Sequence, residues 1–307
     1  MPQNGLANRL QAIASGKLLA NELGMTLKVH WIVEKAMPIN SSEIFDEQTL
    51  LEYFTSPEEG SVYNKIVERS KYFVSLDANS IVIKGMRLGE QRLMNKLKNE
   101  IRIQKENLDV VVISGGKFLL NRNRFFTDSS TFRTLRKEIY DQIKFHKKIL
   151  ENVNALQKQL GKNYVAVHLR GTDRISETIK IKKFIKLLKL DFNNINEPIF
   201  ICGDSYDRRM VLQDSLEKAG FNNIIVPEID FSRSTVSGIQ DAAADWLVLS
   251  KAKKIIFSEG TTFSYEAAVA GGVFSNSVIL KQNRFYRFIR KSVSRLKMAK
   301  LYKQIPF

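Results

Sequence analysis

Two residues at the end of one short apolar segment have the chemistry to hold a phosphorylated ligand. The segment 164–170 (YVAVHLR) is rich in β-branched residues, which is typical of a buried strand. Arg170 leaves the end of that strand, where a guanidinium can donate two parallel hydrogen bonds to diphosphate oxygens. His168 shares its side of the strand and could contact a base or a ribose. The alternative is that His168 is a core histidine and that Arg170 is the partner in a surface ion pair.

A second apolar segment, 198–202, leads through Gly203 to Asp204 and Ser205. An acid at a strand end either bonds a ligand hydroxyl or caps the next helix, and both interpretations stay open. The single cysteine, Cys202, lies inside the apolar run, so we expect a buried strand residue rather than a reactive thiol. One cysteine cannot form an intramolecular disulfide, which fits a reducing compartment.

Two more groups of residues suit a nucleotide ligand. The first group, Ser258, Gly260, Thr261 and Thr262, precedes a predicted helix. Backbone N–H groups at a helix N-terminus bind phosphate oxygens, and capping of the helix would also explain these residues. Asp245, on the preceding helix, either accepts hydrogen bonds from a guanine edge or is a solvated helix acid. Near the start of the chain, a glycine before a helix lets the backbone approach a phosphate closely. This second group comprises Gly5, Leu6, Ala7, Asn8 and Arg9.

The elements that must position these residues are clearest in the second half. Apolar strands alternate there with amphipathic helices, which predicts a parallel sheet covered on both faces. Ligands of such sheets bind beyond the carboxyl ends of the strands. The predicted strands are 164–170, 198–202, 223–226, 254–258 and 277–280, and the predicted helices are 180–190, 210–220, 241–252 and 263–269.

The first half has a predicted helix at 5–24 and strands at 26–32 and 109–114. Further helix is expected at 135–160, and a charged helical stretch at 87–107 is expected as an insertion on the acceptor side. We therefore divide the chain into an N-terminal domain (1–160), a C-terminal Rossmann-like domain (161–282) and a basic C-terminal helix (283–307).

Composition limits the class of protein. The 307 residues are 44% hydrophobic, enough for about two domains, and the net charge of +16 calls for a negative partner or surface. Nucleic acid, anionic lipid and a phosphorylated small molecule all qualify. No signal peptide opens the chain and no apolar window approaches a membrane span, so we expect a cytoplasmic protein or one trimmed of its anchor.

Four segments, in order, resemble motifs of the superfamily of core α1,6-fucosyltransferases, nodulation fucosyltransferases and protein O-fucosyltransferases. Residues 5–31 resemble its first motif, in which a Gly-Asn-Arg-Leu loop starts a helix. The segment 165–173 (VAVHLRGTD) resembles the His-x-Arg motif. The segment 200–205 (FICGDS) resembles the family's Thr-Asp-Asp segment, and the segment 245–264 resembles its last motif.

The resemblance implies an α/β fold of GT-B type, with two Rossmann-like domains facing a cleft. It also implies an inverting transferase that moves fucose from GDP-fucose to a glycan or lipid-linked oligosaccharide, with no cofactor and no metal. Arg170, with Arg174, would neutralise the departing GDP. The resemblance further implies that His168 and Asp245 contact guanine or ribose, that Thr261 bonds phosphate, and that the segment 5–8 closes over the diphosphate.

The sequence departs from the family at several points. Many relatives carry a second arginine where this chain has Gly171, and Thr-Asp-Asp is replaced by Gly203-Asp204-Ser205. Glu177 lies one residue out of register with the base of the core enzymes, so its catalytic role is a hypothesis. No strand precedes the glycine loop, so we expect a misassigned start or a first sheet without that strand.

The segment 283–302 carries seven Lys and Arg residues and no acid. As a helix it would gather its apolar residues on one face, which favours either contact with the inner face of a bacterial membrane or packing on the first domain. Other functions remain open: a transferase of another GDP-sugar, a silent nucleotide-sugar-binding protein, or a nucleic-acid-binding protein. The sequence shows no zinc-ligand spacing, no aromatic RNA-binding strand motif and no recognition helix, so no nucleic-acid partner is expected.

Overall fold

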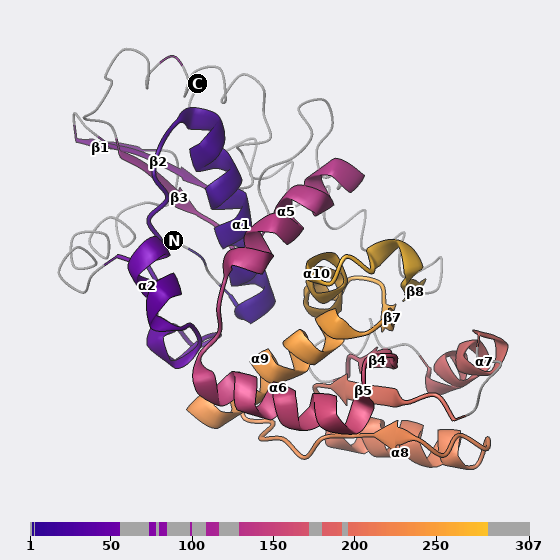
Figure 1. Ribbon diagram of the computed structural model, residues 1–307. Helices are drawn as coiled ribbons and strands as arrows, with labels where there is room; N and C mark the ends of the chain where they lie inside the picture. Colours follow the sequence, from indigo (N-terminus) through magenta and orange to yellow (C-terminus); the bar gives the residue numbers. More distant parts are fainter. Residues whose placement is uncertain are drawn as a thin grey trace.

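A computed structural model of the chain describes residues 2, 4–55, 74–77, 80–84, 99, 109–116, 129–171, 180–191 and 196–281. Two sheets lie at opposite ends of this part of the chain, and helices fill the space between them (Figure 1). Apart from Asn99, the predicted insertion at 87–107 lies outside the described residues. The predicted C-terminal helix (283–307) lies outside them as well.

The larger sheet contains five parallel strands in the order β6-β5-β4-β7-β8. Each coincides with a strand that the sequence predicts, so the parallel sheet of the second half is confirmed. In the central pairing Val165 lies opposite Ile199 on one side and Lys254 on the other. The strands are β4 (Val165–Leu169), β5 (Ile199–Gly203), β6 (Ile224–Ile225), β7 (Lys254–Ser258) and β8 (Val278–Leu280).

Helices cover both faces of this sheet because its strands are apolar on both sides. On one face Ala166 and Phe200 pack beneath α9 (Val236–Lys251) and α10 (Thr262–Ala270). The opposite face packs against α7 (Ile181–Asp191) and α8 (Tyr206–Glu217). All four helices overlap predicted ones, although α8 is shifted toward the N-terminus from the predicted 210–220 and α9 begins five residues before its predicted start at 241. Cys202 is buried under the first face, and burial raises the pKa of its thiol, in agreement with a structural role.

The smaller sheet has the order β1-β2-β3, with strands at Val74–Asp77, Ser80–Lys84 and Asp109–Ile113. β1 runs antiparallel to β2, and β2 runs parallel to β3. The helix α1 (Leu6–Leu23) ends at Gly24, which adopts the left-handed conformation (φ 67°) that glycine takes at little cost. The short helices η1 (Ser41–Glu43) and α2 (Glu47–Tyr53) follow. The predicted helix 5–24 and strand 109–114 are confirmed.

The predicted strand at 26–32 is wrong. Only Val29 pairs there, in a single parallel bridge with Phe54. Its N–H donates to the Tyr53 carbonyl (2.6 Å) and its carbonyl accepts from Thr55 (3.1 Å), but the neighbouring residues continue no ladder. The β-branched pattern reflects burial of Val29 in the core rather than membership of a sheet.

The predicted helix at 135–160 is also wrong as one element, because it is two helices, α5 (Ser130–Gln142) and α6 (Lys147–Leu160). Between them Phe145 forms an antiparallel bridge with Phe45, and the Lys144 N–H donates to the Thr49 hydroxyl (2.9 Å). These backbone groups pair with the segment 44–49 rather than with a helix, which breaks the helix at 143–146.

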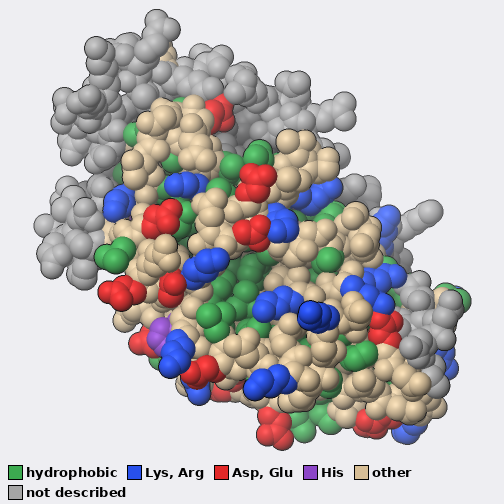
Figure 2. Space-filling view, in the orientation of Figure 1, with side chains coloured by type: hydrophobic (Ala, Val, Ile, Leu, Met, Phe, Trp, Pro, Cys, Tyr) green, Lys and Arg blue, Asp and Glu red, His purple; other side chains and the backbone are tan. Residues whose placement is uncertain are grey.

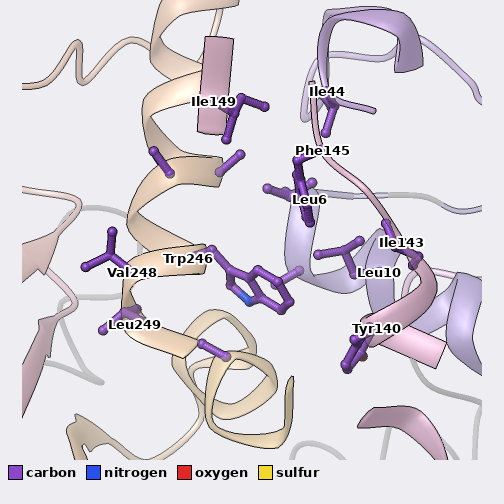
Figure 3. Close-up of a cluster of buried hydrophobic side chains, with 14 of the residues drawn as sticks. Leu6, Leu10, Ile44, Tyr140, Ile143, Phe145, Ile149, Trp246, Val248 and Leu249 are labelled. Carbon is purple, nitrogen blue, oxygen red and sulfur yellow. The ribbon is translucent and has the colours of Figure 1, made fainter. Parts of the chain in front are cut away.

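The helices that precede the larger sheet share its core. α6 packs on α9, and α5 packs on both α10 and α1. Trp246 of α9 lies among side chains from both halves and makes ring contacts with Tyr140 (5.8 Å) and Phe145 (6.0 Å) (Figure 3). The predicted boundary near Gly161 falls between α6 and β4, and the division into domains stays a prediction.

One face of the molecule is hollowed. Figure 2 shows hydrophobic side chains gathered inside a hollow on this face, with Lys and Arg side chains at its rim. Among the described residues, no helix combines the length and apolar character needed to cross a bilayer.

Candidate functional site

The candidate site lies where the order of the larger sheet reverses. The chain leaves β4 toward β5 and β6 on one side, and returns to place β7 and β8 on the other. In open parallel sheets, ligands bind outside the carboxyl ends of the strands at this switch point. The structure brings two predicted groups to it, because Arg170 and Gly171 follow β4 and the segment 258–262 follows β7.

His168 is held inside the protein. It is 5% exposed, its Nδ1 lies 2.6 Å from the Ser264 hydroxyl, and its ring stacks on Phe263 (5.3 Å). Burial lowers the pKa of His168 to about 4, with Arg170 adding to the shift and Asp204 opposing it. A neutral imidazole therefore joins β4 to the first turn of α10. This is the core-histidine arrangement, and it also fixes the loop before α10.

The loop after β7 is ordered by its own hydroxyls. Gly260 adopts a left-handed conformation (φ 92°), which turns the chain into α10. Thr261 stands at the N-cap, where its hydroxyl donates to the Ser258 carbonyl (3.1 Å) and lies 3.0 Å from Ser264 Oγ. Ser258 Oγ is buried and forms no hydrogen bond with the described residues. Thr262 is the first residue of α10, so the four predicted residues of this loop lie together.

Asp204 joins the ends of β4 and β5. Its carboxylate accepts from the Gly171 N–H (2.7 Å) and from Arg233 Nη2 (3.2 Å). The N-cap position of α8 is occupied by Ser205, one residue after Asp204, so Asp204 is not the N-cap residue of this helix. Asp204 instead holds the backbone that follows Arg170.

Asp245 lies in the interior, not at the solvated face of a helix. Its Oδ2 accepts from Arg209 Nη2 (2.8 Å), while Oδ1 has no hydrogen-bond partner among the described residues. Burial raises the pKa of Asp245 to about 6, against the opposing effect of Arg209. Arg209, fully buried, also donates to the carbonyls of Gly203 (2.6 Å) and Pro227 (3.4 Å). A ligand with N–H donors would supply the hydrogen bond that this buried carboxylate oxygen lacks within the described residues.

The first half contributes the start of α1. Gly5 is its N-cap, with no side-chain capping bond and open space where a Cβ would stand. Leu6 and Ala7 are core residues, so only their backbone is available to a ligand. Arg9 is buried: it donates to the Asn4 carbonyl (2.7 Å) and to Glu34 (3.0 Å). Arg9 therefore shapes the loop from beneath.

Two further residues fix this loop. Asn4 takes a left-handed φ of 67°, and its side-chain amide donates to the Gly115 carbonyl (3.3 Å). Trp31 lies under the Arg9 guanidinium, with 4.3 Å between Cζ and the ring centroid. Asn8, partly exposed, lies beside Gly116.

A buried network links α1 to α10. Gln11 Nε2 donates to Glu266 (2.5 Å), and Arg136 and Tyr140 of α5 donate to the same carboxylate. Thus α10, whose first turn contacts His168, is tied to the helix that begins at Gly5. The predicted catalytic residues Arg174 and Glu177 lie outside the described residues, so their roles stay predictions.

Sequence reasoning missed the buried charges Arg209, Arg136 and Glu266. A signal existed for the two arginines, since each occupies an apolar stripe at helical spacing. Arg136 lies in register with Phe132 and Tyr140, and Arg209 with Leu212 and Leu216. An arginine in such a stripe predicts a buried ion pair. Among the described residues, no group of three His, Cys, Asp or Glu side chains could hold a metal ion.

Solved structures resemble this chain over most of its length. NodZ α-1,6-fucosyltransferase, in a crystal soaked with GDP-fucose, is 15% identical at a TM-score of 0.53, covering 88% of this chain and 90% of that one. A mutant FUT1 of Arabidopsis thaliana in complex with GDP is 12% identical at 0.64, covering 92% and 70%. POFUT1 in complex with GDP-fucose is 11% identical at 0.55, covering 92% and 96%.

At these identities the likeness establishes the fold. The chain has the α/β fold of GT-B type that its motifs predict, in agreement with the doubly covered parallel sheet. No family model matches the sequence, and no curated protein matches it either.

Proposed function

We propose that this protein is an inverting, metal-independent glycosyltransferase that transfers fucose from GDP-fucose to a glycan or lipid-linked oligosaccharide. One observation carries the proposal: Arg170, Asp204 and the loop 258–262 converge at the switch point of a fold shared with NodZ and POFUT1, which were solved with GDP-fucose. The function of such a fold is set by the residues of its site rather than by the fold, and these residues lie together here.

The residues present suit a nucleoside diphosphate. Arg170 supplies a planar cation beyond β4, and the N-terminal amides of α10 face the same edge of the sheet. Asp245 Oδ1 and Ser258 Oγ are buried polar atoms that the described protein leaves unsatisfied. The Asp245 oxygen fits the N–H edge of guanine, and the Ser258 hydroxyl fits a donor or acceptor on the ligand.

In the proposed reaction an acceptor hydroxyl oxygen forms a bond to the anomeric carbon of fucose. The bond from that carbon to the β-phosphate oxygen breaks, and GDP leaves with the electron pair. Arg170 and the backbone donors neutralise the charge that develops on GDP. The acceptor proton passes to a general base, for which Glu177 is the candidate from the sequence. Arg174 is the candidate for a further cation.

The proposal includes an acceptor on an anionic membrane surface, reached through the basic segment 283–302 from the cytoplasmic side. Its support is the pattern of Lys, Arg and apolar residues in that segment.

The test is calorimetric titration of the purified protein with GDP in EDTA, with UDP as the control nucleotide. We expect GDP to bind, UDP to bind at least tenfold more weakly, and Arg170→Ala to lose at least tenfold in GDP affinity with its fold intact. Lys189→Ala, which removes an exposed cation from α7, serves as the matched control. Absence of GDP binding in the unaltered protein would overturn the proposal, whereas binding justifies assays of transfer from GDP-fucose.

A further inference from the structure

The side chain of Arg208 lies directly over Gly171. A Cβ at position 171 would overlap Arg208 Cδ and would stand 3.0 Å from Arg208 Nε. Gly171 is itself fixed, since its N–H donates to Asp204. Only a residue without a side chain leaves this space to Arg208, so α8 delivers a guanidinium to the residue that follows Arg170.

The electrostatic setting of Arg208 favours an anion. Partial burial lowers the pKa of Arg208, and Asp204 opposes the shift. That carboxylate also accepts hydrogen bonds from Gly171 and from Arg233. Among the described residues at this edge, Arg170, Arg208 and Arg233 are cationic and Asp204 and Glu259 are anionic, so cations outnumber anions. Arg233 is exposed, whereas Arg170 and Arg208 are partly removed from water, and two such cations are stabilised by a bound anion.

We propose that Arg208 is a second diphosphate-binding cation. It binds the diphosphate of the donor from α8, while Arg170 binds it from the end of β4. The inference rests on the proposed function, since it assigns a residue to the same donor site. A diphosphate offers oxygens on two phosphorus atoms, and two guanidinium groups from separate elements can each take a pair of them. Arg208 would then share the neutralisation of the leaving group with Arg170.

Calorimetric titration with GDP and GMP tests the assignment. Arg208→Ala is expected to weaken GDP binding at least tenfold and GMP binding by less, because GMP lacks the second phosphate. Arg208→Lys should recover part of the GDP affinity, because a lysine keeps the positive charge but lacks the paired N–H donors of the guanidinium. The matched control is Lys218→Ala, which removes one exposed positive charge from the opposite end of α8 and should bind GDP as the unaltered protein does.

A second route displaces Arg208 without altering it. In Gly171→Ala the new methyl group pushes the Arg208 side chain aside, so GDP affinity should fall about as far as in Arg208→Ala. The double variant Gly171→Ala/Arg208→Ala should then bind no more weakly than Arg208→Ala alone, since the overlap is gone. Thermal unfolding of each variant establishes that it is folded.

The outcomes separate the two proposals. If the unaltered protein binds no GDP, the donor site itself is wrong. If it binds GDP and folded Arg208→Ala binds within twofold of it, the assignment of Arg208 is overturned while the proposed function stands. Equal losses for GDP and GMP would also overturn the assignment, because they would show that Arg208 does not distinguish the second phosphate.

Discussion

Arg136 and Glu266 form a two-point ion pair in the interior of the molecule. Arg136 Nε donates to Glu266 Oε2 (3.0 Å) and its Nη2 donates to Oε1 (3.1 Å), and both side chains are fully buried. Tyr140 donates to Oε2 (2.7 Å), and Gln11 donates to Oε1 (2.5 Å). The carboxylate is therefore satisfied by donors from α1 and α5, and α10 cannot shift relative to the start of α1 without breaking these bonds.

Glu266→Gln should destabilise the protein strongly. The substitution leaves the Arg136 cation buried without a counter-charge, which costs about 3–5 kcal/mol of unfolding free energy. Urea unfolding measures the loss. The matched control is Asp141→Asn, which breaks the exposed pair with Lys137 on α5 and should cost about 1 kcal/mol or less. Equal losses in the two variants would contradict the buried ion pair.

Replacement of both partners should cost less than the sum of the single changes. Arg136→Met combined with Glu266→Leu removes both charges and fills much of their volume, so no buried ion stays uncompensated. A double-mutant cycle from urea unfolding should show a favourable coupling of about 1–3 kcal/mol between the two positions. Additive losses would indicate that the two charges act independently.

Gly5→Ala should separate ligand binding from stability. Gly5 has a φ of −70°, and there is open space at the position that an alanine methyl group would take, so the substitution should cost only the weaker N-cap, about 1 kcal/mol or less of unfolding free energy. The same methyl would stand where we propose the diphosphate to approach, so GDP affinity should fall at least tenfold. Gly24→Ala at the other end of α1 should do the reverse, since its φ of 67° disfavours alanine. Unchanged GDP affinity in Gly5→Ala would remove the loop from the donor site.

His168 should make stability depend on pH. Its folded pKa of about 4 lies below the unfolded value near 6.5, so its contribution is present above pH 6.5 and is lost as the pH falls toward 4. The loss amounts to about 3 kcal/mol over that window. Asp245 acts oppositely: its raised pKa adds stability below about pH 4 that is lost as the pH rises through 6. His168→Gln should flatten the acid loss in urea unfolding between pH 4.5 and 7.5, and parallel curves would contradict the shift.

Gly203→Ala should disturb the joint between β4 and β5. A Cβ at Gly203 would overlap the Leu169 carbonyl oxygen, and backbone cannot move aside as a flexible side chain does. We expect a loss of about 1–3 kcal/mol in unfolding free energy, as for other overpacked sites. Thermal unfolding checks this, with Gly5→Ala as the alanine control in open space. A loss no larger than in that control would mean that the strands separate easily.

The sequence predicted the second half well because its signals are local. Each strand is a short β-branched run between turn residues, and each helix carries a stripe that buries residues such as Phe184 or Leu212. The carboxyl ends of parallel strands necessarily share one edge, so Arg170 and the loop 258–262 could be placed together in advance. The first half was harder. The segment 26–32 resembles a strand but pairs only at Val29, and the break at 143–146 depends on a partner nearly a hundred residues away.

Contacts between distant residues account for what the sequence did not reveal. Asp204 could have been a helix cap, and only the position of Gly171 shows that it holds the β4 end. His168 could have been a ligand or a core residue, and its bond to Ser264 depends on the packing of α10. Gly171 stood out in the sequence merely as a departure from a motif. The structure gives it a physical reason, because Arg208 fills the space that a side chain would take.

The packing of α5 and α6 has a consequence for protein engineering. Both helices precede the larger sheet in the sequence, yet α6 packs on α9 and α5 packs on α10 around the ring of Trp246. A chimaera that joined the sheet of this protein to the front half of another protein of the same fold at residue 160 would uncover that packing surface. An exchange that keeps α5 and α6 with the sheet, and is spliced before Ser129, would transfer the intact core.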